Sequence, residues 1–136
     1  MTSEDLVVAV FDALMALDDA QLAFETVTGS RRIVARATDS GFQVELFDRT
    51  GDAHDRERFA RRQVVQVLER AVALPTAEDV IITKLRWAKA AGRRKDFDDA
   101  RNVLAVQRVT LDWGYLNRWC SNLDVLDLLD TIRVSP

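Results

Sequence analysis

The chain has 136 residues, of which 48% are hydrophobic and 30% are charged, and its formal net charge is −3 at pH 7. This length and composition fit one soluble domain with a core of its own. The net negative charge argues against a nucleic-acid backbone as the main partner, because the basic clusters Arg31-Arg32, Arg61-Arg62 and Arg93-Arg94-Lys95 are short and separated. The sequence has no apolar run near membrane-spanning length, so we expect a cytoplasmic protein that does not enter the membrane.

Cys120 is the single cysteine, so no intrachain disulfide can form, which is typical of a reducing compartment. Its spacing from Leu116, Trp119 and Leu123 is that of a helical core stripe. We therefore expect a buried structural thiol and no nucleophile, since the only histidine, His54, falls in a segment that reads as a polar loop.

Two helices are expected at the start of the chain. Thr2 is a helix-start residue with an acidic first turn after it, and an apolar stripe follows as far as about Leu17. A second, shorter helix is expected to carry Leu22 and Phe24 and to end near Thr28-Gly29-Ser30.

The next segment alternates polar and apolar residues. Residues 32–37 and 42–47 have this period of two on either side of Thr38-Asp39-Ser40-Gly41, which predicts an antiparallel hairpin. Glu45 is central in the second strand, on the face opposite Val44 and Leu46. If helices cover both faces of the sheet, Glu45 will be half buried.

The rest of the chain reads as mostly helical. A short helix is expected from Asp55 to Arg62 and one or two strands between Gln63 and Leu74, and four helices follow, the first capped by Thr76. The predicted fold class is α+β, a small, mostly antiparallel sheet flanked by helices, in a single domain 1–136. Within it, residues 1–74 form helices plus the sheet, and residues 75–136 form a helical part.

Two of these helices meet at a Gly-Arg-Arg turn, and each directs charge inward. On helical wheels Lys84 lies in the apolar stripe of the first helix, Asp96 lies in that of the second, and Asp99 lies at its margin. In one interpretation Lys84 extends its ammonium to the rim, and Asp96 caps its helix or forms a local salt bridge near the helix start. In the other the charges line a site for an anion, such as a nucleotide phosphate, or for a metal.

The same segments resemble a known family. Phe42-Gln-Val-Glu45-Leu-Phe47, then Pro75-Thr-Ala-Glu78-Asp-Val-Ile-Ile-Thr-Lys84-Leu-Arg-Trp87, then Lys95-Asp96-Phe-Asp-Asp99 are similar to motifs of nucleotidyltransferase-fold proteins of the abortive-infection AbiEii type. The tail from Leu111 to Trp119 is similar to the helical end of their bacterial relatives. The resemblance covers about the last two thirds of the chain.

The resemblance implies transfer of a nucleoside monophosphate from a nucleoside triphosphate onto a hydroxyl group, with magnesium. By motif, Glu45 falls on the family's third metal-binding acid, Lys84 on its lysine, and Asp96 and Asp99 on its helix aspartates. Ahead of Glu45, however, the chain lacks the family's Gly-Ser turn and Asp-x-Asp strand, since Thr28-Gly29-Ser30 is too close to the hairpin to serve.

We therefore expect a nucleotidyltransferase-like domain without catalytic activity of its own, in which Lys84 binds a nucleotide or another anion, or which binds a protein partner. A homodimer through an exposed sheet edge is expected on physical grounds. One alternative is a magnesium-dependent nucleotidyltransferase that a different chain completes. Another is an interaction module of a toxin-antitoxin type system, in which Lys84 and Asp96 form only an ion pair.

Overall fold

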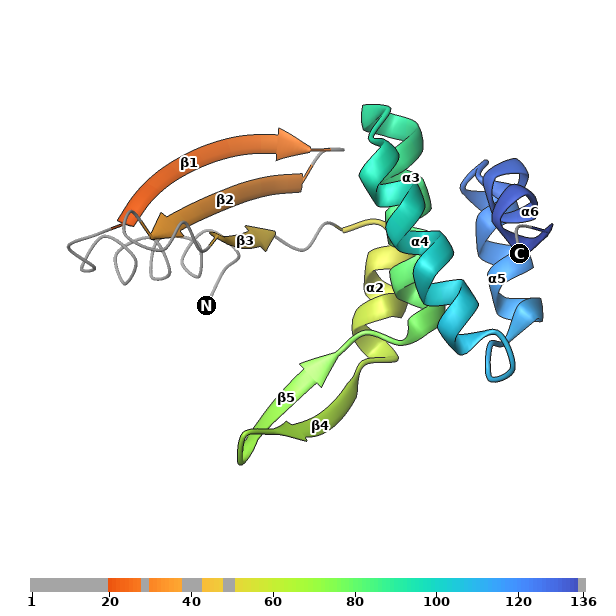
Figure 1. Cartoon of the computed structure of the whole chain (residues 1–136), viewed down its shortest axis with the longest axis horizontal. Coiled ribbons are helices and arrows are strands. Elements are labelled where there is room, and N and C mark those ends of the chain that lie inside the picture. The colour runs from red at the N-terminus through yellow and green to blue at the C-terminus, as the bar shows by residue number, and fades with distance from the viewer. Residues whose placement is uncertain (1–19, 28–29, 38–42, 48–50, 135–136) are drawn as a thin grey trace. The chain divides into compact units, whose positions relative to one another are not determined.

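The computed structural model describes residues 20–27, 30–37, 43–47 and 51–134 and has an α+β fold (Figure 1). This confirms the predicted fold class. The chain divides into two compact units, Met1–Gly51 and Asp52–Pro136, and each is described by itself.

The first unit holds a three-stranded antiparallel sheet in the order β1-β2-β3. Its strands are β1 (Ala20–Val27), β2 (Ser30–Ala37) and β3 (Gln43–Phe47). Ile33 of β2 lies opposite Phe24 of β1 and Leu46 of β3, so β2 is the central strand. The predicted hairpin of β2 and β3 is confirmed.

The short helix expected around Leu22 and Phe24 is wrong, because this segment is strand β1. Leu22 and Phe24 are two residues apart, which is a strand spacing, and β1 pairs with β2 along its whole length. The other N-terminal helix, which was expected to reach Leu17, and the turn Thr38-Asp39-Ser40-Gly41 lie outside the described residues.

The second unit begins with a short helix and a hairpin and continues with four helices. These elements are α2 (Ala53–Ala60), β4 (Gln63–Val67), β5 (Arg70–Leu74), α3 (Ala77–Ala91), α4 (Arg94–Gln107), α5 (Trp113–Asn122) and α6 (Leu126–Val134). All seven match elements expected from the sequence. In Figure 1 the β4–β5 hairpin extends away from the helices.

Helix α3 begins and ends with strong local signals. Thr76 Oγ1 accepts a hydrogen bond from the Asp79 backbone N–H at 3.2 Å, the geometry of an N-cap. Gly92 ends the helix with a φ of 62°, in the left-handed region that glycine adopts most readily. The chain can therefore reverse within two residues, and α4 packs beside α3.

The core of this unit lies among its four long helices. Its fully buried apolar side chains come from all of them and from the turn before α6, and they include Ile81, Ile82, Leu85, Ala100, Leu104, Leu116, Cys120, Val125, Leu129 and Ile132. Burying each large aliphatic side chain contributes about 1.5–3 kcal/mol. Cys120 is buried as predicted, and burial raises the pKa of its thiol to about 12.

Within the described ranges, no helix has the length and apolarity needed to cross a membrane.

Candidate functional site

Lys84 of α3 lies between two carboxylates of α4. Its Nζ donates hydrogen bonds to Asp96 Oδ1 and Asp99 Oδ2, both at 3.1 Å. The Asp96 side chain is 1% exposed, while the Lys84 side chain is 25% exposed, so the ammonium reaches the rim and the carboxylate stays inside. The structure thus brings together three of the four residues that the sequence selected.

Two further cations complete this network. Arg93 Nε lies 3.2 Å from Asp96 Oδ2, and Lys95 Nζ donates to Asp99 Oδ2 at 2.9 Å. Partial burial would lower the pKa of Lys84, but its hydrogen bonds to Asp96 and Asp99 outweigh burial and raise the pKa above its ordinary value. Lys84 is therefore held as a cation whose charge is matched by carboxylates in direct contact.

An open hollow of about 280 Å³ lies beside the α3–α4 turn. Ala88, Phe97 and Leu128 give it apolar walls, and charged side chains complete the lining: Lys89, Arg93, Arg94 and Asp127. Each of the three cations already pairs with an aspartate: Lys89 with Asp124, Arg93 with Asp96, and Arg94 with Asp98. The hollow is consequently an apolar depression with neutralised charges at its rim.

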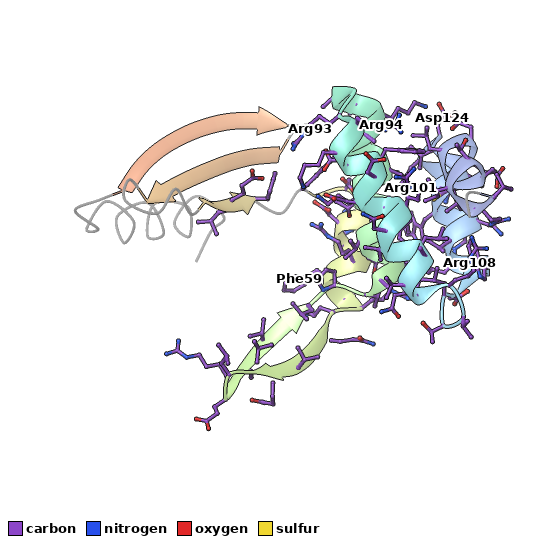
Figure 2. The ribbon with its side chains drawn as sticks, viewed as in Figure 1. Phe59, Arg93, Arg94, Arg101, Arg108 and Asp124 are labelled. Carbon is purple, nitrogen blue, oxygen red and sulfur yellow. The ribbon has the colours of Figure 1, made fainter. Side chains whose placement is uncertain are left out.

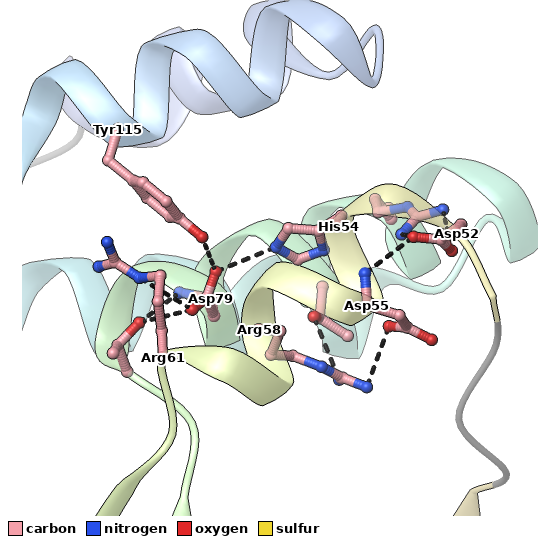
Figure 3. Close-up of polar contacts among 10 residues, drawn as sticks. Asp52, His54, Asp55, Arg58, Arg61, Asp79 and Tyr115 are labelled. Carbon is pink, nitrogen blue, oxygen red and sulfur yellow. Dashed lines mark hydrogen bonds and ion pairs between the residues drawn. The ribbon is translucent and has the colours of Figure 1, made fainter.

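A second polar cluster is centred on Asp79, in the first turn of α3 (Figure 3). Asp79 Oδ1 accepts hydrogen bonds from the Tyr115 hydroxyl at 2.5 Å and from His54 Nε2 at 3.1 Å. Asp79 Oδ2 accepts from Thr76 Oγ1 at 2.9 Å and lies 3.5 Å from Arg61 Nε. One fully buried carboxylate therefore joins α2, α3 and α5.

These hydrogen bonds set the charge of Asp79. Burial would raise the pKa of its carboxyl group, but the bonds from His54, Tyr115 and Thr76 outweigh burial and hold the pKa below its ordinary value. Burial and the bond to the Asp79 carboxylate raise the pKa of Tyr115. Asp79 is thus an ionised, well-satisfied carboxylate inside the fold, and Arg61 stacks over the Tyr115 ring 3.7 Å from its centre.

His54 is the clearest correction at this cluster. It was expected in a polar loop, but it lies in α2, is 1% exposed, and its ring centre is 5.2 Å from that of Trp119. Its Nδ1 has no hydrogen-bond partner among the described residues. Asp79 lies three residues before Ile82, on the same face of α3, and this spacing could have marked Asp79 as buried. The residues next to His54 contain no such pattern.

Glu45 belongs to the first unit, in β3 opposite Val34. It is exposed, so the expectation of half burial is wrong; its face of the sheet is open at this position. The described residues contain no group of three acidic, histidine or cysteine side chains arranged to hold a metal ion. The structure therefore gathers Lys84, Asp96 and Asp99 within the second unit, while Glu45 belongs to the first.

Comparison of the chain with protein-family models, with curated proteins and with solved structures found no match. The likeness to AbiEii-type nucleotidyltransferases stays a prediction that rests on the motifs themselves.

Proposed function

We propose that this chain is a nucleotidyltransferase-like domain that does not catalyse transfer by itself and that works by binding a protein partner. The observation that carries the proposal is the position of Lys84, whose ammonium is already bonded to two carboxylates at 3.1 Å. In this interpretation the charged residues shared with the family hold α3 against α4 and do not bind a nucleotide.

Electrostatics supports a structural role for Lys84. A phosphate that approaches Lys84 meets Asp96 and Asp99 at the same position, and like charges at this distance repel each other. Displacing Asp96 from Lys84 would leave a carboxylate that is 1% exposed with Arg93 as its one remaining cation in this network, which is costly in a site with so little access to water. The neutralised rim of the neighbouring hollow offers an anion no better site.

The sequence supports the absence of transfer activity. Two-metal chemistry needs several carboxylates around the same ions, and β1, the strand directly before the hairpin, contains one acid, Glu25, and no Asp-x-Asp pair. Glu45 would then be the only strand acid of the family's set that this chain retains.

A protein partner is favoured by the apolar side chains that the second unit leaves in contact with solvent. Val64 is 67% exposed, Val67 46% and Leu68 92%, all on or beside β4, and Phe59 at the base of the hairpin is 48% exposed (Figure 2). They lie on both faces of the hairpin, because side chains alternate along a strand, and apolar side chains gathered on one arm in this way are typical of an interaction surface.

Calorimetric titration of the purified chain with ATP, GTP, CTP and UTP in magnesium tests the proposal. We expect no saturable heat with any of them. Lys84→Met, which keeps the length of the side chain and removes its charge, is the matched variant, with circular dichroism to show that it folds. Saturable binding by the wild type that Lys84→Met abolishes would overturn the proposal and assign Lys84 to a nucleotide site.

A further inference from the structure

The β4–β5 hairpin is a two-stranded sheet with exposed faces. In its register Val65 lies opposite Val72, Val64 opposite Ala73 and Gln63 opposite Leu74. Every residue of β4 is exposed, and Val72 alone in β5 is half buried. An isolated two-stranded hairpin is marginal in water, so such an arm gains stability when further strands extend it.

Within the described part of the chain no third strand pairs with this sheet, so β4 and β5 each have one open edge. Proteins usually block an open edge with a lysine, a proline, a bulge or an inward charge. The edge of β4 has none of these, because its sequence is Gln-Val-Val-Gln-Val. The edge of β5 begins at Arg70 and runs directly into Pro75, which has no N–H to donate.

The backbone of β4 has hydrogen-bonding groups directed at this open edge. Leu68 and Glu69 form a two-residue turn, and the pair next to such a turn, Val67 and Arg70, exchanges its backbone hydrogen bonds across the hairpin. The direction of the backbone hydrogen bonds alternates from one residue to the next along a strand. Val65, two residues before Val67, therefore also bonds toward β5. The N–H and C=O groups of Val64 and Gln66 then face outward and can accept a further strand.

We propose that the occupant of this edge is a second copy of the same chain, paired antiparallel along β4 with the twofold axis at Val65. The inference rests on the proposed function, that the domain works through a protein partner, and it names that partner. In this register Val65 lies opposite Val65 of the second copy, Val64 opposite Gln66, and Gln63 opposite Val67. Two hairpins become one four-stranded antiparallel sheet.

The length of β4 selects this register. The strand ends at Val67, because Leu68 and Glu69 turn the chain back into β5, so only Gln63 to Val67 can pair along the open edge. With the axis at Val65 all five residues have a partner in the second copy, whereas an axis at Gln66 would pair only Val65, Gln66 and Val67. None of the five residues is charged, so the strand meets its own copy without like-charge repulsion.

Disulfide trapping of the full chain tests the register. Val65→Cys places two thiols at a pair without mutual backbone hydrogen bonds, where Cα atoms are about 4.5 Å apart, within the range of a disulfide. Val67→Cys is the matched control, because it is also exposed but lies opposite Gln63. The native Cys120 is fully buried and should not compete. Under mild oxidation we expect Val65→Cys to form a covalent dimer and Val67→Cys to remain monomeric.

Sedimentation of the unmodified chain provides the second measurement. We expect a species of twice the 15.4 kDa chain mass at high concentration, and loss of that species in Val65→Lys, which places two ammonium groups opposite each other. A wild-type chain that stays monomeric, or equal crosslinking of the two cysteine variants, would overturn the inference. Neither result would bear on the nucleotide titration, so failure of this interface and failure of the proposed function can be told apart.

Discussion

At the scale of single residues, Asp96 is the buried carboxylate between α3 and α4. Asp96→Asn should lower the free energy of unfolding by roughly 2–3 kcal/mol, because Lys84 and Arg93 both lose their buried anionic partner. Asp98→Asn is the matched control two residues away. Its salt bridges with Arg94 and Arg101 lie at the surface, so it should change stability by less than about 1 kcal/mol. Urea unfolding of both variants measures the difference; equal losses would contradict a special role for Asp96.

Asp79 makes the fold sensitive to acid. The pKa of its carboxyl group lies below the ordinary value of 3.8, so the unfolded chain binds this proton more tightly than the folded chain. The stability that Asp79 provides is therefore complete above pH 3.8 and is lost as pH falls through the folded-state pKa. Asp79→Asn should be less stable than the wild type at about pH 5, and this gap should narrow by about pH 3. Urea midpoints at the two pH values test this; a gap that stays constant would contradict it.

The charged pair could be read from the sequence, but the burial of His54 against Asp79 could not. Lys84 and Asp96 each interrupt an apolar stripe of period 3.6, so the wheels alone place them between two helices. His54 has no such pattern around it, and it is buried by residues that are 25 and more positions away, Asp79 and Trp119. Burial that depends on distant partners leaves no local signal.

At the scale of elements, the turn between α3 and α4 depends on glycine. Gly92→Ala should cost about 1 kcal/mol, because alanine is strained at a φ of 62° even though an added Cβ meets nothing within 4 Å. The matched change is Gly114→Ala in α5, which meets only Asp112 Oδ1 at 3.4 Å and should gain up to about 1 kcal/mol from helix propensity. The midpoint temperature of thermal unfolding should fall for Gly92→Ala and rise for Gly114→Ala. A shift of both midpoints in the same direction would contradict the role of glycine in this turn.

The turn of the β4–β5 hairpin holds strain of the same kind. Leu68 and Glu69 have φ values of 48° and 64°, as in the hairpin turn for which Asn-Gly is preferred. Replacing the pair by Asn-Gly should therefore raise stability by roughly 1–2 kcal/mol. Unfolding by urea measures the gain, and a loss of stability would show that Leu68 makes contacts its 92% exposure does not suggest.

Helices and strands were predicted correctly where the sequence pattern of the segment itself was sufficient. The prediction failed at β1, where the pattern was taken for a short helix. Helices α3 to α6 each have an apolar stripe within their own residues, Thr76 and Asp112 cap α3 and α5, and α2 and the β4–β5 hairpin lie close to where they were predicted. The spacing of Leu22 and Phe24 fits a strand, but β1 is stabilised by its pairing with β2. That pairing is a tertiary contact, which the residues of β1 alone do not indicate.

At the scale of the whole molecule, we assign a structural role to the charged network of Lys84, Asp96 and Asp99 and a role in self-association to the β4–β5 hairpin. One series of amide NMR spectra tests both assignments on the same labelled chain. Dilution should move the amide signals of Val64 to Val67 as the dimer separates, and added magnesium ATP should leave those of Lys84, Asp96 and Asp99 unchanged. If magnesium ATP shifts the α3–α4 amides saturably while dilution leaves β4 unchanged, the domain is a nucleotide-binding protein and the account is contradicted.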